Sequence, residues 1–169
     1  MQLLSAEGRA LHGLLWRLTQ RADVAEDLMQ DLVIKLADSA TFSRADRPAA
    51  FARRAATNLA LDWRRKQKRR GLAADWSTVQ HTRAADSPGP VSVLEQDDEI
   101  ARLLDALAQM KPTDRVVLTM RYLEEADYDA VAAAVGKTAA QARGLCFKAV
   151  RRLRKQLTKI ETVEVRHGA

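Results

Sequence analysis

Hydrophobic residues recur along most of this chain at steps of three and four, the spacing of amphipathic helices rather than strands. A first helix is marked by four leucines: Leu11, Leu14, Leu15 and Leu18. A second, opened by Asp23, stacks Leu28, Leu32 and Leu36. The stretch TFSRADRP that follows is expected to be a loop, and Pro48 suits the first position of a third helix. That helix carries one apolar stripe: Phe51, Ala55, Leu59 and Trp63.

The periodic pattern stops between Gly71 and Val93, where Ser, Thr, Asp, Pro and Gly mix without order, as in a flexible linker. It returns in a helix with Ile100, Leu103, Leu104 and Leu107. Pro112 breaks that helix, and Thr113 is placed to cap the next one. After Thr158 no clear pattern remains, so we expect a frayed tail.

The stretch from Asp127 to Lys155 has the features of a helix-turn-helix. Asp127 can cap a short first helix, and Gly136 can adopt the positive φ needed at the turn. Thr138 and Gln141 have capping-box spacing at the start of the second helix. One face of that helix is apolar: Ala142, Leu145 or Cys146, Ala149, Val150 and Leu153. The other face is basic: Arg143, Lys148, Arg151, Arg152, Arg154 and Lys155.

These elements predict an all-α protein of two small helical domains joined by a flexible linker, the second domain being the helix-turn-helix. The expected boundaries are 1–72 for the first domain, 73–93 for the linker, 94–160 for the second domain and 161–169 for the tail. Each domain ends in a basic helix. From Arg64 to Arg70, six of seven residues are basic, a composition typical of phosphate contacts.

Charge and reactive residues narrow the range of functions. The net charge of +6 favours a polyanionic partner. One cysteine permits no internal disulfide, which favours a reducing, cytoplasmic location. The N-terminus does not resemble a signal peptide, and no window is apolar for long enough to insert into a membrane. The three histidines lie on unrelated elements, without nucleophile, base or metal-ligand spacing. We therefore expect neither an enzyme nor a cofactor.

The segments AEDLMQDLVIKL, AAFARRAATNLALDWRRKQKRR, LLDALAQMKPTDRVVLTMRYL and YDAVAAAVGKTAAQARGLCFKAVRRLR resemble regions two and four of bacterial extracytoplasmic-function (ECF) RNA polymerase sigma factors, in the same order and with a similar gap. The resemblance implies a sigma factor that binds core RNA polymerase and directs promoter recognition, strand opening and transcription initiation. Its partners would be core polymerase and promoter DNA, with an anti-sigma factor as a further candidate.

The resemblance also implies roles for individual residues. Polymerase would be bound by Asp27, Gln30 and Asp31, which otherwise read as an ordinary solvated acidic face. The −10 element would be bound by Asn58, Arg64, Arg65, Lys66 and Lys68, with the Asn58 amide reading a base flipped from the non-template strand. The −35 element would be bound by Thr138, Gln141, Arg143, Lys148, Arg151 and Arg152. The recognition helix departs from the family at Leu145, where an arginine is common.

A second function class remains open at this stage: a helix-turn-helix regulator that binds duplex DNA as a dimer without polymerase. Co-purification with polymerase would distinguish the two. For a sigma factor the expected mechanism is binding rather than chemistry. In the free protein, an acidic N-terminal half would fold against a basic C-terminal half and mask both DNA surfaces. On polymerase the linker would extend and separate the domains.

Overall fold

Three long helices build the N-terminal unit of the protein, and the second and third begin within one residue of where the sequence predicts. They are α1 (Gln2–Thr19), α2 (Ala22–Ala37) and α4 (Pro48–Arg69). The computed structural model describes residues 2–71 and 90–167, and the side chains of 6–71 and 97–159. Residues 73–89 of the predicted linker therefore lie outside the described residues. Pro48 occupies the first turn of α4, as predicted.

Two local expectations about the N-terminal unit are wrong. The stretch after α2 is not all loop, because Ala40–Ser43 forms one helical turn, α3, capped by the Ser39 side chain, which accepts from Phe42 N. In α4, the predicted apolar stripe is only partly buried. The fully buried positions lie beside it: Ala52, Ala56, Thr57, Ala60, Leu61 and Arg64. Helix α4 packs against other helices on more than one side, so its best-buried stripe contains small residues.

The C-terminal unit contains α5 (Pro90–Ala108), α6 (Pro112–Leu118), the π-turn η2 (Thr119–Leu123), α7 (Tyr128–Val135) and α8 (Ala139–His167). Thr113 is not a cap, because α6 begins at Pro112 with Lys111 as its N-cap. The expected frayed tail is also wrong: α8 continues to His167. Adding a residue to an existing helix is far easier than starting one, so the absence of a clear pattern did not end it.

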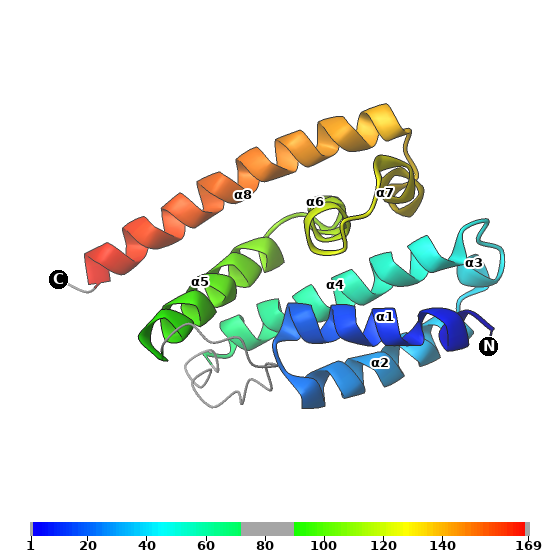
Figure 1. The fold of residues 1–169 in the computed structure, drawn as a ribbon, viewed down its shortest axis with the longest axis horizontal. Coiled ribbons are helices and arrows are strands. Elements are labelled where there is room, and N and C mark those ends of the chain that lie inside the picture. The colour runs from blue at the N-terminus through cyan, green and yellow to red at the C-terminus, as the bar shows by residue number, and fades with distance from the viewer. Residues whose placement is uncertain (1, 72–89, 168–169) are drawn as a thin grey trace.

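The two units pack directly on each other (Figure 1). Helices α5, α6 and α7 lie against α4, while α1 and α2 cover other sides of α4. Helix α8 lies beyond α5, α6 and α7 and does not share the layer of α4. The described residues are helical or irregular and contain no strand, so the all-α prediction is confirmed.

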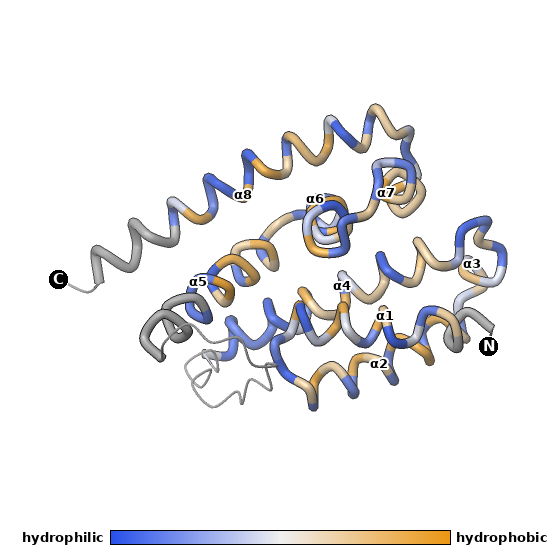
Figure 2. Tube along the Cα trace, viewed as in Figure 1, coloured by the Kyte–Doolittle hydropathy of each residue, from blue (hydrophilic) through white to orange (hydrophobic). Residues whose placement is uncertain are grey.

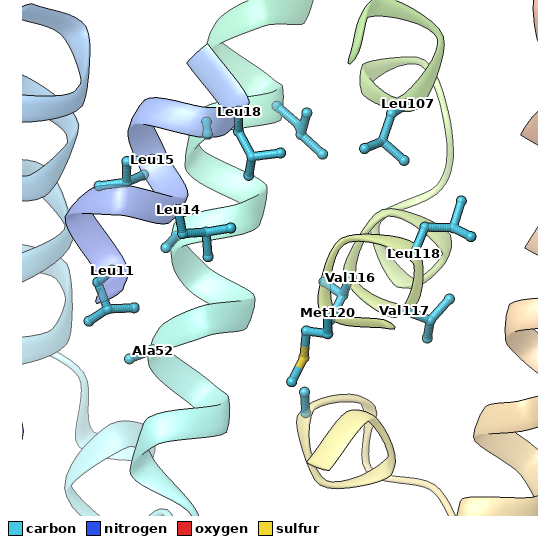
Figure 3. Packing of buried hydrophobic residues seen from close by; sticks show 14 of the residues in the cluster. Leu11, Leu14, Leu15, Leu18, Ala52, Leu107, Val116, Val117, Leu118 and Met120 are labelled. Carbon is cyan, nitrogen blue, oxygen red and sulfur yellow. The ribbon is translucent and has the colours of Figure 1, made fainter. Parts of the chain in front are cut away.

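The hydrophobic core is continuous across both units. Leucines of α1 pack near Ala52 of α4, and residues of α5, α6 and η2 face them from the other unit (Figure 3). Hydrophobic and hydrophilic residues alternate along α8, which places an apolar stripe on the inner side of that helix (Figure 2). Ala142, Cys146 and Ala149 are its buried members, and this settles the choice between Leu145 and Cys146 in favour of Cys146.

Candidate nucleic-acid interface

The basic C-terminal end of α4 is divided between the interior and the surface. Arg64 is 1% exposed and does not face solvent. Its Nη2 donates to Asp105 Oδ1 (2.7 Å) and to the Ala101 carbonyl (3.1 Å), and its Nε donates to the same carboxylate (3.1 Å). Burial lowers the pKa of Arg64, against the opposing effect of Asp105. In this packed arrangement Arg64 is not available to a phosphate, because Asp105 and the Ala101 carbonyl of α5 occupy its donors.

The neighbouring basic residues keep more freedom. Lys68 reaches the same carboxylate more loosely, with 3.5 Å between Nζ and Asp105 Oδ2. Arg65 pairs with Asp62 on its own helix at 3.2 Å, and Lys66 is exposed. A solvent-facing basic surface therefore remains at the end of α4, and the buried Arg64 is not part of it.

Asn58 lies on a face of α4 that is turned toward the C-terminal unit. One helical turn earlier, Arg54 Nη1 donates to the Ala134 carbonyl of α7 (3.4 Å). The Asn58 Oδ1 atom is buried and accepts no hydrogen bond from any residue that the structure describes. A buried acceptor without a donor is unfavourable by about 1–3 kcal/mol. The closed packing thus buries the oxygen of the amide to which the resemblance assigns base reading.

The acidic face of α2 is open. Asp27, Gln30 and Asp31 are all exposed, while Leu28 and Leu32 on the opposite side pack into the core. Within the described side chains, neither carboxylate of this face forms an ion pair or a hydrogen bond. Their negative charge is not compensated inside the protein and is available to a partner.

The predicted helix-turn-helix is present, and its caps form as expected. Asp127 caps α7 by accepting from Ala130 N at 2.7 Å, and Gly136 ends that helix with a φ of 65°. Thr138 Oγ1 accepts from Gln141 N (3.3 Å), and Gln141 Oε1 accepts from Thr138 N (3.1 Å). This reciprocal pair starts α8, but it also occupies the amide oxygen that Gln141 would need for a bidentate contact with adenine.

The outer face of α8 presents Arg143, Lys148 and Arg151 to solvent. Arg152 behaves differently, because its Nη1 lies 3.0 and 2.9 Å from the two oxygens of Asp114, a residue with only 4% side-chain exposure. Arg152 therefore compensates a buried charge, while half of its side chain remains exposed. The expectation that the closed form masks both DNA surfaces is wrong for α8, whose basic face stays open.

Sequence reasoning did not identify the residues that join the two units. Arg115 is fully buried and donates to Asp62 Oδ1 (2.8 Å) and to the carbonyls of Ala108 (2.7 Å) and Met110 (2.8 Å). Arg17 Nη1 donates to the Leu123 carbonyl at 2.8 Å. Asp62 and Arg115 are 53 positions apart in the sequence, and Arg17 and Leu123 are 106 positions apart. No local sequence pattern reveals contacts over such separations.

The charge pattern of the interface is the reverse of the expected one. Cations of the N-terminal unit approach acceptors of the C-terminal unit, including Arg47 Nη1 with the Asp129 carbonyl (3.5 Å). In the ion pair between Arg115 and Asp62, by contrast, the C-terminal unit supplies the cation and the N-terminal unit supplies the carboxylate. The acidic face of α2 takes no part, because it lies on the outer side of the N-terminal unit.

Among the described residues, no group of three His, Cys, Asp or Glu side chains is placed to hold a metal ion. Cys146 is buried, and its burial raises the pKa of the thiol, which disfavours the reactive thiolate. No helix in the described ranges has the length and apolar character needed to cross a bilayer.

Comparison with known families identifies the family to which the chain belongs. Residues 3–70 match the family model of sigma-70 region 2, and residues 100–153 match that of sigma-70 region 4. The chain belongs to the sigma-70 family of RNA polymerase sigma factors. This sigma factor carries regions 2 and 4 with only residues 71–99 between them, which is the layout of the ECF group. It acts in promoter recognition and transcription initiation, so the alternative of a polymerase-independent regulator is set aside.

Among solved structures, the sigma factor is similar to a co-crystal structure of the sigma factor RpoE in complex with the anti-sigma factor NepR from Bartonella quintana. The two chains are 22% identical, with 93% of this chain and 95% of the other covered and a TM-score of 0.47. No curated protein sequence matches the chain.

Proposed function

We propose that this sigma factor binds the clamp of core RNA polymerase through the acidic face of α2, formed by Asp27, Gln30 and Asp31. The observation that carries the proposal is that both carboxylates are exposed and unpaired in the part of the chain that the structure describes. Unpaired exposed charges contribute little to folding, whereas against a basic partner they speed association and fix orientation.

Helix α4 is then the strand-reading element. Asn58 offers both an amide donor and an acceptor to a flipped −10 base, and its buried, unpartnered oxygen would gain a hydrogen bond there. Arg65, Lys66 and Lys68 would hold the backbone phosphates beside the melted strand. Arg64 would join them only after Asp105 withdraws.

Helix α8 would read the −35 element. Its N-terminal part enters the major groove in the usual docking of this motif. Arg143 would contact a guanine, and Lys148 and Arg151 would contact phosphates. Thr138 and Gln141 would act mainly by capping the N-terminus of α8. Arg152 would act by its ion pair with Asp114 and by adding positive charge to the surface.

The packed arrangement of the two units is proposed to be the resting state of the free protein. Region 4 covers α4, so a promoter strand cannot reach Asn58 until the units separate. Binding of region 2 to polymerase would favour separation, and the segment between α4 and α5 would let region 4 move to the −35 position. An anti-sigma factor that held the units together would keep the protein inactive. The function would be binding without catalysis, in the cytoplasm.

A charge-reversal experiment tests the polymerase contact. The double variant Asp27→Lys, Asp31→Lys should no longer co-purify with core polymerase. Its helical circular dichroism should be unchanged, because both residues are exposed. The matched control reverses two other exposed acids of region 2, Asp38 and Asp46, and should still co-purify. Equal loss in both double variants would mean that net charge, not the α2 face, controls binding. Retention in both would remove the α2 face from the proposal.

A further inference from the structure

The guanidinium of Arg143 lies over an aromatic ring. Its Cζ is 5.1 Å from the centroid of the Tyr128 ring, within the range of a cation–π contact. Arg143 is exposed on the second turn of α8, and it forms no hydrogen bond or ion pair with any other residue in the described ranges. Within those ranges, the ring of Tyr128 is therefore the polar or aromatic partner of the end of this side chain.

Tyr128 itself is held firmly. It is the first residue of α7, next to the Asp127 cap, and it is partly buried against the hydrophobic core. A second guanidinium, that of Arg121, has its Cζ 4.8 Å from the same ring centroid. Arg121 is in turn fixed by its Nη1 donating to the Ala126 carbonyl at 3.0 Å. A ring fixed in this way can impose its orientation on the more mobile Arg143.

We propose that Tyr128 is a positioning residue that presents Arg143 to its base. Stacking uses the flat face of the guanidinium and leaves the N–H groups at its edge free, and these are the groups that bind guanine O6 and N7. An arginine already held in place loses less side-chain freedom when it binds. The inference rests on the proposed base contact of Arg143 and adds the residue in the first helix of the motif on which that contact depends.

The test measures base preference rather than overall activity. Full-length protein is assembled with core polymerase and used to select transcribed promoters from a library randomised over the −35 element. Relative to wild type, Tyr128→Leu should weaken the preference at the base pair read by Arg143 by roughly two- to fivefold, the range expected for an exposed cation–π contact. Tyr128→Phe, which keeps the ring face, should retain the wild-type preference.

Two comparisons separate positioning from general damage. In an Arg143→Ala background, Tyr128→Leu should cause no further change in preference, because the residue it positions is gone. Tyr122, an exposed tyrosine at 62%, supplies the matched control: Tyr122→Leu removes a surface ring and should leave preference unchanged. Tyr128→Met replaces the leucine variant if the latter melts below the assay temperature.

The outcomes distinguish this inference from the function beneath it. If Arg143→Ala loses a base preference and Tyr128→Leu does not, the base contact stands and the positioning role is overturned. If Tyr128→Phe behaves like Tyr128→Leu, the hydroxyl rather than the ring face acts, which also overturns it. If Arg143→Ala keeps every preference and only weakens binding, the base contact itself fails and the inference fails with it.

Discussion

Both buried cations at the interface between the units are arginines. Arg115 forms three hydrogen bonds, to one carboxylate and two carbonyls, and Arg64 engages Asp105 through both Nε and Nη2. A guanidinium offers five donors in a fixed plane, whereas an ammonium is a compact and strongly hydrated charge. Lysine in either position would leave acceptors unpaired, so these two sites depend on guanidinium geometry as well as on charge.

Glu124 is an acid in an unfavourable position at the same interface. Its Oε1 lies 3.7 Å from Arg53 Nε, and its buried Oε2 has no hydrogen-bond partner among the described residues. Burial raises the pKa of Glu124, and this effect exceeds the opposing attraction of Arg53 and Arg17. The folded protein therefore holds the Glu124 proton more tightly than the unfolded chain does.

That imbalance predicts a pH-dependent effect of Glu124→Gln. Because the folded pKa is raised, the stability contributed by Glu124 is greatest below its ordinary pKa of 4.5 and is lost as the pH rises through the folded value. The neutral amide avoids this loss. The variant should melt above wild type at pH 7.5, by about 2–4 °C for each kcal/mol gained, and the difference should vanish near pH 4. Glu125→Gln, at an exposed neighbour, is the control and should show no such trend.

At the scale of elements, the short-range chemistry of the helix-turn-helix was well predicted by the sequence, whereas the cap at Thr113 and the loop after α2 were not. The caps at Asp127 and Thr138 and the turn at Gly136 formed as expected, because each depends on residues no more than four positions apart. The main errors have the opposite character. The stripe of α4 was misjudged because α4 packs against α1 and α2 as well as against α5, α6 and α7. The burial of Arg64 was missed because it depends on α5, which comes from another part of the chain. Amphipathic spacing reveals one buried face but not a second packing partner.

The start of α8 gives a prediction at this scale. Thr138→Ala removes the side-chain acceptor for Gln141 N and should destabilise region 4 by about 1 kcal/mol, the typical value of an N-cap. The melting temperature should fall by about 2–4 °C. The control is Thr158→Ala in the same helix, where the hydroxyl bonds to the Arg154 carbonyl one turn back and alanine is the better helix former. If both variants melt alike, the capping box does not stabilise α8.

In addition to the shared hydrophobic core, several cations of region 2 bind carbonyls and carboxylates of region 4 across the interface. Arg17, Arg54 and Arg64 all contribute in this way from α1 and α4. Two of the acceptors, Leu123 O and Ala134 O, are near the ends of helical segments, where unpaired carbonyls carry partial negative charge. Region 4 thus offers α4 a substitute for the negative charge of nucleic acid.

Removing that substitute should open the protein. Asp105→Ala leaves Arg64 buried without its carboxylate. Removal of one partner of a buried ion pair typically destabilises the folded arrangement by about 3–5 kcal/mol. The free full-length variant should have a larger radius of gyration by small-angle scattering and bind single-stranded DNA more tightly. The slope of log affinity against log salt should steepen by about 0.7 for each added phosphate contact.

The matched control is Asp98→Ala, which removes the same charge from an exposed position of α5. It should match wild type in scattering and show only the small gain in DNA affinity expected from the altered net charge. Identical scattering and DNA binding in the Asp105 variant and this control would show that the Arg64–Asp105 pair does not keep the units together.

Helix α4 cannot be covered by region 4 and open to a promoter strand at the same time. The apparent affinity for a promoter strand is then the intrinsic affinity reduced by the fraction of molecules that are open. Each additional 1.4 kcal/mol or so of closing free energy lowers that fraction tenfold. Substitutions at Asp105 or Glu124, which alter the packing between the units, would therefore set the concentration at which this sigma factor engages its promoter.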